Sequence, residues 1–221
     1  MRKSVSNKWM EDLEWKNPPK QSRSERTRDS LLDAAERLFG EHGADATSVT
    51  DIAKASGCSI GALYHHFKDK AALKEALFAR GAQRIERSSA TALDPAIWEG
   101  ATIIDILKRY LEFTLQIEQE SPGFKTAIKE AIKDRADLWQ QFSAIEHKLF
   151  DGFRALLMMR TGEIGHPDPE LAIRFIIDQC KAMTVVRCDR TTDFDQLRNV
   201  PDAVFVDEFL HSARAYLQLR K

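Results

Sequence analysis

The pattern of apolar and polar positions predicts helices along most of this chain. Apolar residues recur at intervals of three and four, as one buried helix face requires, and no run shows the alternation with period two that is typical of a strand. The stretch from Ala136 to Arg160 keeps this spacing over its whole length, at Leu138, Phe142, Ile145, Leu149, Phe153 and Leu156. The pattern therefore predicts an all-α fold.

Glycines, prolines and polar clusters separate about nine predicted helices. The first is expected from about Ser24 to Gly40, two short ones lie between Thr47 and Phe67, and a fourth runs from about Lys70 to Arg87. Five further helices follow: Ile103 to Gln119, Phe124 to Lys133, Ala136 to Arg160, Pro169 to about Arg187, and Pro201 to about Leu219. Residues 1–22 contain Pro18-Pro19 and are expected to form an arm without regular structure.

The segment from Thr47 to Phe67, TSVTDIAKASGCSIGALYHHF, is predicted to form two short helices joined by a tight turn. Thr47 and Ser59 are each predicted to cap a helix, because a hydroxyl can accept a hydrogen bond from a backbone N–H one turn later. Gly57 is predicted to end the first helix in a left-handed conformation. Each helix has one apolar face, formed by Val49, Ile52 and Ala53 in the first and by Ile60, Leu63 and Phe67 in the second.

The opposite face of the second short helix carries small, aromatic and hydrogen-bonding residues, namely Gly61, Ala62, Tyr64, His65 and His66. Such a face fits the major groove of DNA, whereas leucines would be expected in a helix that is buried on all sides. The segment is therefore predicted to be a helix-turn-helix that binds nucleic acid.

About fifty residues around this segment resemble the TetR-type (tetracycline-repressor-like) family of transcriptional regulators in residue type, spacing and helix order. The matching residues are Leu31, Ala34, Ala35, Leu38, Phe39, Gly43, Thr47, Ile52, Ala53, Ala55, Gly57, Ser59, Gly61, Leu63, Tyr64, His66, Phe67, Lys70 and Leu73. Ser56 and Cys58 depart from the family's usual alanine and valine, and both are small. The resemblance implies four parts: an arm at 1–22, a three-helix DNA-binding domain at 23–68, a linking helix at 69–87, and a ligand-binding and dimerisation domain at 88–221.

The resemblance also implies contacts with double-stranded DNA. Positions that usually hold phosphates are matched by Thr47, Ser48, Tyr64, His66 and Lys70, and positions that face base edges by Ile60, Gly61, Ala62 and His65. Ser59 belongs to the same surface, and His65 is the expected polar base reader. Such arms often contact the minor groove, for which the candidates are Lys20, Arg23 and Arg26; the alternative is a solvated tail.

A homodimer is expected through the last two helices. The final helix has an apolar stripe (Ala203, Val206, Leu210, Ala213 and Leu217) and further aromatic residues beside it, and the preceding helix is apolar over much of its girth. One buried face is enough for a helix at the end of a soluble chain, so this girth predicts a second packing surface. The resemblance implies a four-helix bundle across a two-fold axis, and with it a pseudo-palindromic operator.

The resemblance further implies that the C-terminal domain holds a small-molecule effector that controls DNA binding, usually to relieve repression. Aromatic and polar residues on its helices are the candidate contacts: Trp98, Tyr110, Phe113, Phe124, Trp139, Phe142, Asp178 and Gln179. The same aromatic residues at helical spacing are also typical of an ordinary core. The alternative is a DNA-binding regulator or architectural protein without a ligand. The sequence does not identify the effector or the operator, and it does not distinguish repression from activation.

Composition and charge narrow the class further. The chain has 30% charged residues and no run of eighteen apolar ones, so no membrane span is expected. The first residues lack the apolar core of a signal peptide, and the three cysteines show neither metal-ligand spacing nor a disulfide framework. We therefore expect a cytoplasmic protein without a cofactor. A small basic excess through Arg87 and an acidic excess after it agree with DNA contact at one end.

Neither an enzyme nor a metal site is expected. The chain has no glycine-rich phosphate loop, no His-x-x-x-His pair and no nucleophile elbow. His65 and His66 are adjacent, and adjacent residues on a helix point about 100° apart, so they are poorly placed to share a metal ion.

Overall fold

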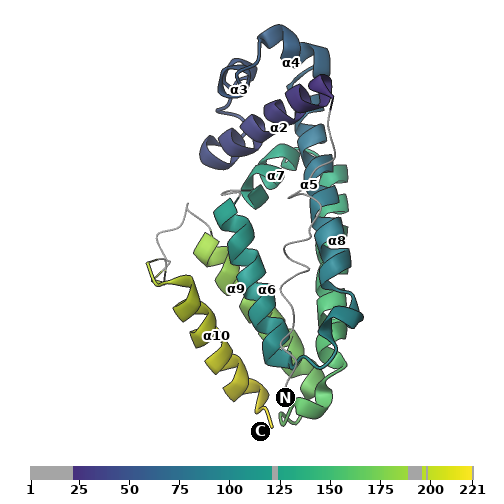
Figure 1. Ribbon diagram of the computed structural model, residues 1–221, viewed down its shortest axis with the longest axis vertical. Helices are drawn as coiled ribbons and strands as arrows, with labels where there is room; N and C mark the ends of the chain where they lie inside the picture. The colour runs from purple at the N-terminus through teal and green to yellow at the C-terminus, as the bar shows by residue number, and fades with distance from the viewer. Residues whose placement is uncertain (1–21, 121–123, 189–195, 198, 221) are drawn as a thin grey trace. The chain divides into compact units, whose positions relative to one another are not determined.

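The computed structural model describes residues 22–120, 124–188, 196–197 and 199–220, and over these residues it contains helices and no strand (Figure 1). The α-helices are α2 (Arg23–His42), α3 (Val49–Ala55), α4 (Ile60–His66), α5 (Lys70–Ala92), α6 (Ile103–Glu120), α7 (Phe124–Ile132), α8 (Ala136–Met158), α9 (Pro169–Cys188) and α10 (Asp202–Leu217). Two short 3-10 helices, η2 (Pro95–Trp98) and η3 (Thr161–Glu163), lie in the connections. The prediction of an all-α fold is confirmed.

The chain forms two compact units. The N-terminal unit comprises the described residues up to Ser88 together with residues 124–146, and the C-terminal unit comprises residues 89–120 and the described residues from His147 onward. The sequence division placed 124–146 with the C-terminal domain, whereas in the structure α7 and the start of α8 group with α2, α3 and α4. The helices α5 and α8 each have residues in both units.

The N-terminal unit is built around α2. Leu31, Leu32, Ala35 and Phe39 are fully buried on one face of this helix, which packs most extensively against α7 and also contacts α3 and α4. The buried face of α7 supplies Phe124, Ala127, Ile128, Ala131 and Ile132. Burial of these apolar side chains is the main source of stability for the three-helix region, because α3 and α4 are too short to be stable alone.

The C-terminal unit has a single apolar core to which α6, α9, α10 and the second half of α8 contribute. α6, α9 and α10 pack against one another, as their neighbouring positions in Figure 1 indicate. Tyr110 on α6 stacks on Phe153 of α8, with ring centroids 4.5 Å apart. Among the described helices, none is long and apolar enough to cross a membrane.

Residues 217–220 form backbone hydrogen bonds with the connection between α8 and α9. The backbone N–H of Gly165 donates to the carbonyl oxygens of Leu217 (3.2 Å) and Gln218 (3.1 Å), and that of Arg220 donates to Glu163 (2.9 Å). A side chain at Gly165 would meet the Gln218 carbonyl oxygen at 2.5 Å, so this approach requires glycine. The bonds fix where α10 ends.

Candidate nucleic-acid interface

Two hydroxyl caps and one glycine set the geometry of α3, the turn and α4. The Ser48 hydroxyl accepts from the backbone N–H of Asp51 (3.1 Å), and the Asp51 carboxylate accepts from the backbone N–H of Ser48 (3.0 Å), a reciprocal capping box. The hydrogen bond from the Ser48 hydroxyl lowers the pKa of Asp51. Gly57 adopts a φ of 69° just after α3, which confirms the predicted left-handed stop.

Thr47 does not cap α3, contrary to the sequence prediction. Its side chain is 2% exposed, and its hydroxyl donates to the carbonyl oxygen of Gly43 at 2.9 Å, so Ser48 takes the capping position. The β-branched methyl of Thr47 suits this buried position, whereas serine suits an exposed cap. The side chain of Thr47 is therefore set apart from the other predicted phosphate contacts.

The second helix, α4, is held by its cap and by two buried residues. The Ser59 hydroxyl accepts from the backbone N–H of Ala62 at 3.0 Å, as predicted for a cap. Leu63 is fully buried and Phe67 is 3% exposed. The guanidinium of Arg28 on α2 lies 5.7 Å from the centroid of the Phe67 ring. These contacts fix the orientation of α4 against α2.

Ile60 is not buried with Leu63 and Phe67, contrary to the sequence prediction. Its side chain is 44% exposed. The reason is its place at the first position of α4: helical side chains tilt toward the N-terminus, and none of the described helices covers this one there. Ile60 therefore joins the exposed face of α4.

The exposed face of α4 brings together most of the predicted base-reading residues. Gly61 and His65 are exposed, Tyr64 is 51% exposed, and Ala62 and His66 are half-buried. Of the predicted phosphate contacts nearby, Ser48 is exposed and Lys70 is half-buried at the start of α5. Lys54, in the last turn of α3, and Lys68, just after α4, are also exposed. Sequence reasoning did not single them out, although their charge was visible.

The predicted arm contacts fall partly outside the described residues. Lys20 lies outside them, and Arg23 and Arg26 are exposed in the first turn of α2. Ser22 caps this helix: its hydroxyl accepts from the backbone N–H of Glu25 (3.2 Å), and the Glu25 carboxylate accepts from the backbone N–H of Ser22 (2.7 Å). These bonds lower the pKa of Glu25 and fix the start of α2.

A polar network joins α7 to the connection between α2 and α3. The Glu130 carboxylate accepts from the backbone N–H of Ala44 at 3.1 Å. The Lys133 ammonium donates to Asp45 at 2.7 Å and to Glu130 at 3.2 Å, which raises the pKa of Lys133 and lowers that of Asp45. Sequence reasoning missed these residues because no local pattern reports a contact between distant segments.

The predicted effector contacts are divided between the two units. Phe124, Trp139 and Phe142 belong to the N-terminal unit, where Trp139 is 46% exposed and the two phenylalanines are buried. The other five lie in the C-terminal unit, namely Trp98, Tyr110, Phe113, Asp178 and Gln179. Trp98 is part of the core and Asp178 is exposed on α9. Helical spacing identifies the inward face of a helix, and it does not separate core from cavity.

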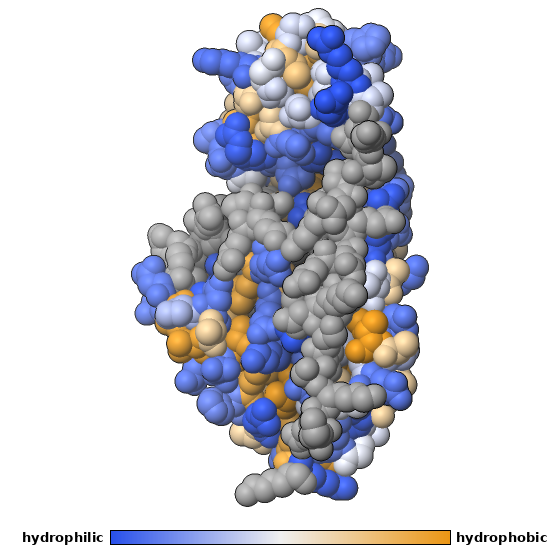
Figure 2. Space-filling view, in the orientation of Figure 1, coloured by the Kyte–Doolittle hydropathy of each residue, from blue (hydrophilic) through white to orange (hydrophobic). Residues whose placement is uncertain are grey.

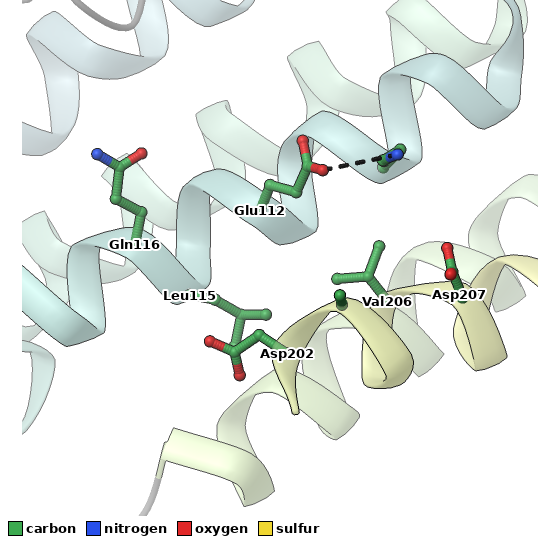
Figure 3. A pocket seen from close by; sticks show the side chains of 8 residues that line it. Glu112, Leu115, Gln116, Asp202, Val206 and Asp207 are labelled. Carbon is green, nitrogen blue, oxygen red and sulfur yellow. Dashed lines mark ion pairs between the residues drawn. The ribbon is translucent and has the colours of Figure 1, made fainter. Parts of the chain in front are cut away.

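A cavity of about 280 Å³ opens between α6 and α10 (Figure 3). Its apolar lining comes from Leu115, Val206 and Ala203. Its polar lining comes from Lys108, Gln116 and the carboxylates of Glu112, Asp202 and Asp207. Glu112 pairs with the ammonium of Lys108 at 3.8 Å. None of the eight predicted effector contacts lines this cavity.

The outer face of α9 carries exposed apolar side chains. Leu171 and Phe175 are 53% and 51% exposed and lie one turn apart, and Val185 and Val186 are exposed near the end of the helix. Val204, 47% exposed, is in the first turn of α10. Figure 2 shows orange apolar surface among blue side chains on the side where Figure 1 draws α10. We refer to Leu171, Phe175, Val185 and Val186 of α9 together with Val204 of α10 as the apolar outer face.

Comparison with known proteins agrees with the geometry of α2 to α5. Residues 31–77 match the model of the bacterial regulatory proteins of the tetR family. The HTH-type transcriptional regulator AcrR of Shigella flexneri is 50% identical over 50 residues, which is 23% of each chain. The regulator UidR of Escherichia coli (strain K12) is 31% identical over 114 residues, 52% of this chain and 54% of UidR. The chain therefore spans little more than half the length of these curated relatives at most.

A solved structure extends the similarity in fold over nearly the whole chain. Salmonella enterica GusR superposes with a TM-score of 0.53 at 27% identity, covering 90% of this chain and all of the GusR chain. The curated relatives are transcriptional regulators, in agreement with the prediction of a regulator rather than an enzyme.

Proposed function

Because this chain belongs to the TetR family of bacterial regulatory proteins, we propose that it is a sequence-specific DNA-binding regulator that represses transcription. It binds a pseudo-palindromic operator as a homodimer, and a small-molecule effector in the C-terminal unit releases it. The exposed face of α4 carries this proposal: a capped helix, locked by Leu63 and Phe67, presents Ile60, Gly61, Tyr64 and His65 to solvent.

In this proposal α4 enters the major groove and the flanking groups hold the phosphates. A recognition helix reads base edges with its N-terminal residues, and Ile60 and Gly61 are the first two residues of α4. Ser48, Lys54 and Lys68 are exposed around it and supply hydrogen bonds and charge for the backbone. The phosphate contacts provide affinity and the base contacts provide sequence preference.

The apolar outer face supports the homodimer. Leu171 and Phe175 expose about half of their surface, and a second copy of this face would remove them from water. In a homodimer with a two-fold axis, the two α4 helices would contact successive major grooves on one side of the duplex, about 34 Å apart. The operator would then have two half-sites of opposite orientation.

The cavity between α6 and α10 gives the effector one place to bind. Leu115 and Val206 supply apolar surface there, and the charged and polar side chains around them supply groups that orient a ligand. The helix α5 has residues in both units and is one covalent route between effector and reader. Couplings between two such sites typically amount to about 1–3 kcal/mol.

Selection of bound DNA from fragmented genomic DNA tests the main proposal. Purified protein is expected to enrich fragments that share one pseudo-palindromic motif, and footprinting of a selected fragment should protect both half-sites. The variant Tyr64→Ala/His65→Ala, which alters only exposed side chains, is the matched control and should lose the enrichment. Enriched fragments without a common motif would contradict sequence-specific binding.

Assembly and effector response need separate measurements. Sedimentation velocity at micromolar concentration is expected to show a dimer, and Leu171→Glu/Phe175→Glu should shift it to monomer. A chain that sediments only as monomer would contradict the dimer. A thermal-shift screen of small molecules, followed by release of the selected operator, separates an effector-controlled regulator from a regulator without a ligand.

A further inference from the structure

The reading helix lacks every side chain that makes a two-point contact with a base. Between Ser59 and Phe67 the chain has no Arg, Lys, Asn, Gln, Asp or Glu. Arginine and lysine recognise guanine in the major groove, asparagine and glutamine recognise adenine, and acidic side chains accept from cytosine. Sequence preference at α4 must therefore come from other chemistry.

Ile60 is the large aliphatic side chain that α4 exposes. It is 44% exposed at the first position of the helix, whereas Leu63 is fully buried. Ala62 is half-buried and offers one methyl group. Next to Ile60, Gly61 has no side chain, and a Cβ there would meet only the Ser59 hydroxyl oxygen, at 3.8 Å. The backbone of α4 can therefore come close to a base edge while Ile60 projects beside it.

The major-groove edge of DNA offers one apolar group, the C5-methyl of thymine. Contact between this methyl and Ile60 removes apolar surface of both from water, and it needs no donor or acceptor. The contact is also rigid on the protein side, since Ser59 caps α4 and the burial of Leu63 and Phe67 fixes its orientation.

We propose that Ile60 is a specificity-determining residue that recognises the C5-methyl of thymine at one position of each half-site. This proposal rests on the proposed function and deepens it, because it names the chemical group that is read. 5-Methylcytosine carries a methyl at the same place on the base edge. Methylation of a cytosine at this position therefore reproduces part of the contact, and DNA methylation changes the affinity of this chain for such a site.

Uracil substitution tests the proposal directly, because uracil lacks only the methyl group. Each thymine of a selected operator is replaced in turn by uracil, and binding is measured by fluorescence anisotropy. One position per half-site is expected to lose affinity by about fourfold, as the burial of one methyl-sized group predicts. A further duplex with a C·G pair at that position should gain affinity when its cytosine is methylated at C5.

Two variants assign the effect to the side chain. Ile60→Ala should bind the thymine and uracil operators equally, and Ile60→Val should keep most of the discrimination. The exposure of Ile60 makes loss of folding unexpected, and thermal unfolding of each variant checks this. Lys68→Ala, at an exposed neighbouring charge, should weaken binding to both operators alike and keep the difference between them.

The outcomes separate the two proposals. A selected operator that binds equally well with uracil at every position overturns the role of Ile60 and leaves sequence-specific binding intact. Uracil sensitivity that persists in Ile60→Ala overturns the assignment to this residue. Failure to select any common motif overturns the proposed function itself.

Discussion

The carboxylate of Glu130 accepts a hydrogen bond from the backbone N–H of Ala44, 3.1 Å away, although 86 positions separate the two residues in sequence. Ala44 is fully buried in the short connection between α2 and α3. A buried N–H must find a partner, and here the partner is a side chain of α7. The start of the helix-turn-helix thus depends on a residue far along the chain.

Glu130→Ala is expected to destabilise the protein by about 1–3 kcal/mol, because it leaves the N–H of Ala44 buried without an acceptor. Glu130→Gln retains an acceptor oxygen and should cost less. The free energy of unfolding from urea denaturation measures both. Equal stability of the alanine and glutamine variants would show that this hydrogen bond contributes nothing.

The lowered pKa of Asp137 implies that the free energy of unfolding depends on pH. Hydrogen bonds from the guanidinium of Arg135 lower the pKa of Asp137 from 3.8 to about 2. Because the folded value lies below the unfolded one, the stabilisation is fully present above pH 3.8 and is lost as the pH falls through about 2.

The difference in urea midpoint between the wild type and Asp137→Asn should therefore be largest above pH 3.8 and disappear below about pH 2. Glu99→Gln, at an exposed carboxylate, is the control. A difference that is constant over this range would mean that the ion pair does not stabilise the fold.

Substitution by alanine is expected to affect stability at Gly165 but not at the nearby Gly162. Gly165→Ala places a methyl group 2.5 Å from the carbonyl oxygen of Gln218, which is backbone and cannot rotate away. We expect a loss of about 1–3 kcal/mol in the free energy of unfolding. Gly162→Ala meets nothing within 4 Å and should be nearly neutral. If both variants unfold alike in urea, the C-terminal residues do not dock as described.

The cap of α4 should contribute measurably to stability. Ser59→Ala removes the acceptor for the N–H of Ala62 and is expected to cost about 1 kcal/mol in urea unfolding. Ser59→Asn keeps a capping oxygen and should retain most of that energy. An asparagine variant as unstable as the alanine variant would point to a role of the hydroxyl other than capping.

His65 and Lys70 should affect DNA binding in different ways. Loss of a good base contact at His65 costs about 1–3 kcal/mol at the cognate base and relaxes preference there. Lys70→Ala should weaken all sequences alike and reduce the salt slope of binding by about one. Anisotropy titrations over a salt series, with cognate and mutated operators, distinguish the two. Unchanged preference in His65→Ala would remove it from the reading face.

Local chemistry made much of the fold predictable. Gly57 stops α3, Ser59 caps α4, and the two prolines Pro169 and Pro201 stand at the starts of α9 and α10, as expected. These signals act over a few residues and are visible in sequence. α5 was expected to end at Arg87 and continues to Ala92, because no glycine or proline occurs between Arg87 and Pro95.

Packing between distant segments was not predictable in the same way. Periodicity placed Ile60 on the buried face of α4, but it cannot tell whether a neighbour reaches the helix end. The packing of α7 on α2 joins distant segments, and Glu130 and Lys133, which bond to Ala44 and Asp45 beside it, read as ordinary surface charges. The cavity lining between α6 and α10 is mainly charged and aliphatic, so the search for aromatic residues overlooked it.

In α4, the residues that pack in the core differ from the residues proposed to recognise DNA. The core contact of α4 comes from Leu63, and Phe67 closes its end, while Ile60, Gly61, Tyr64 and His65 contribute little buried surface. Exchanging these four side chains should therefore retarget the chain to other DNA sequences at small cost in stability. The fold tolerates such redesign because the side chains proposed to face the DNA are not the side chains that pack in the core.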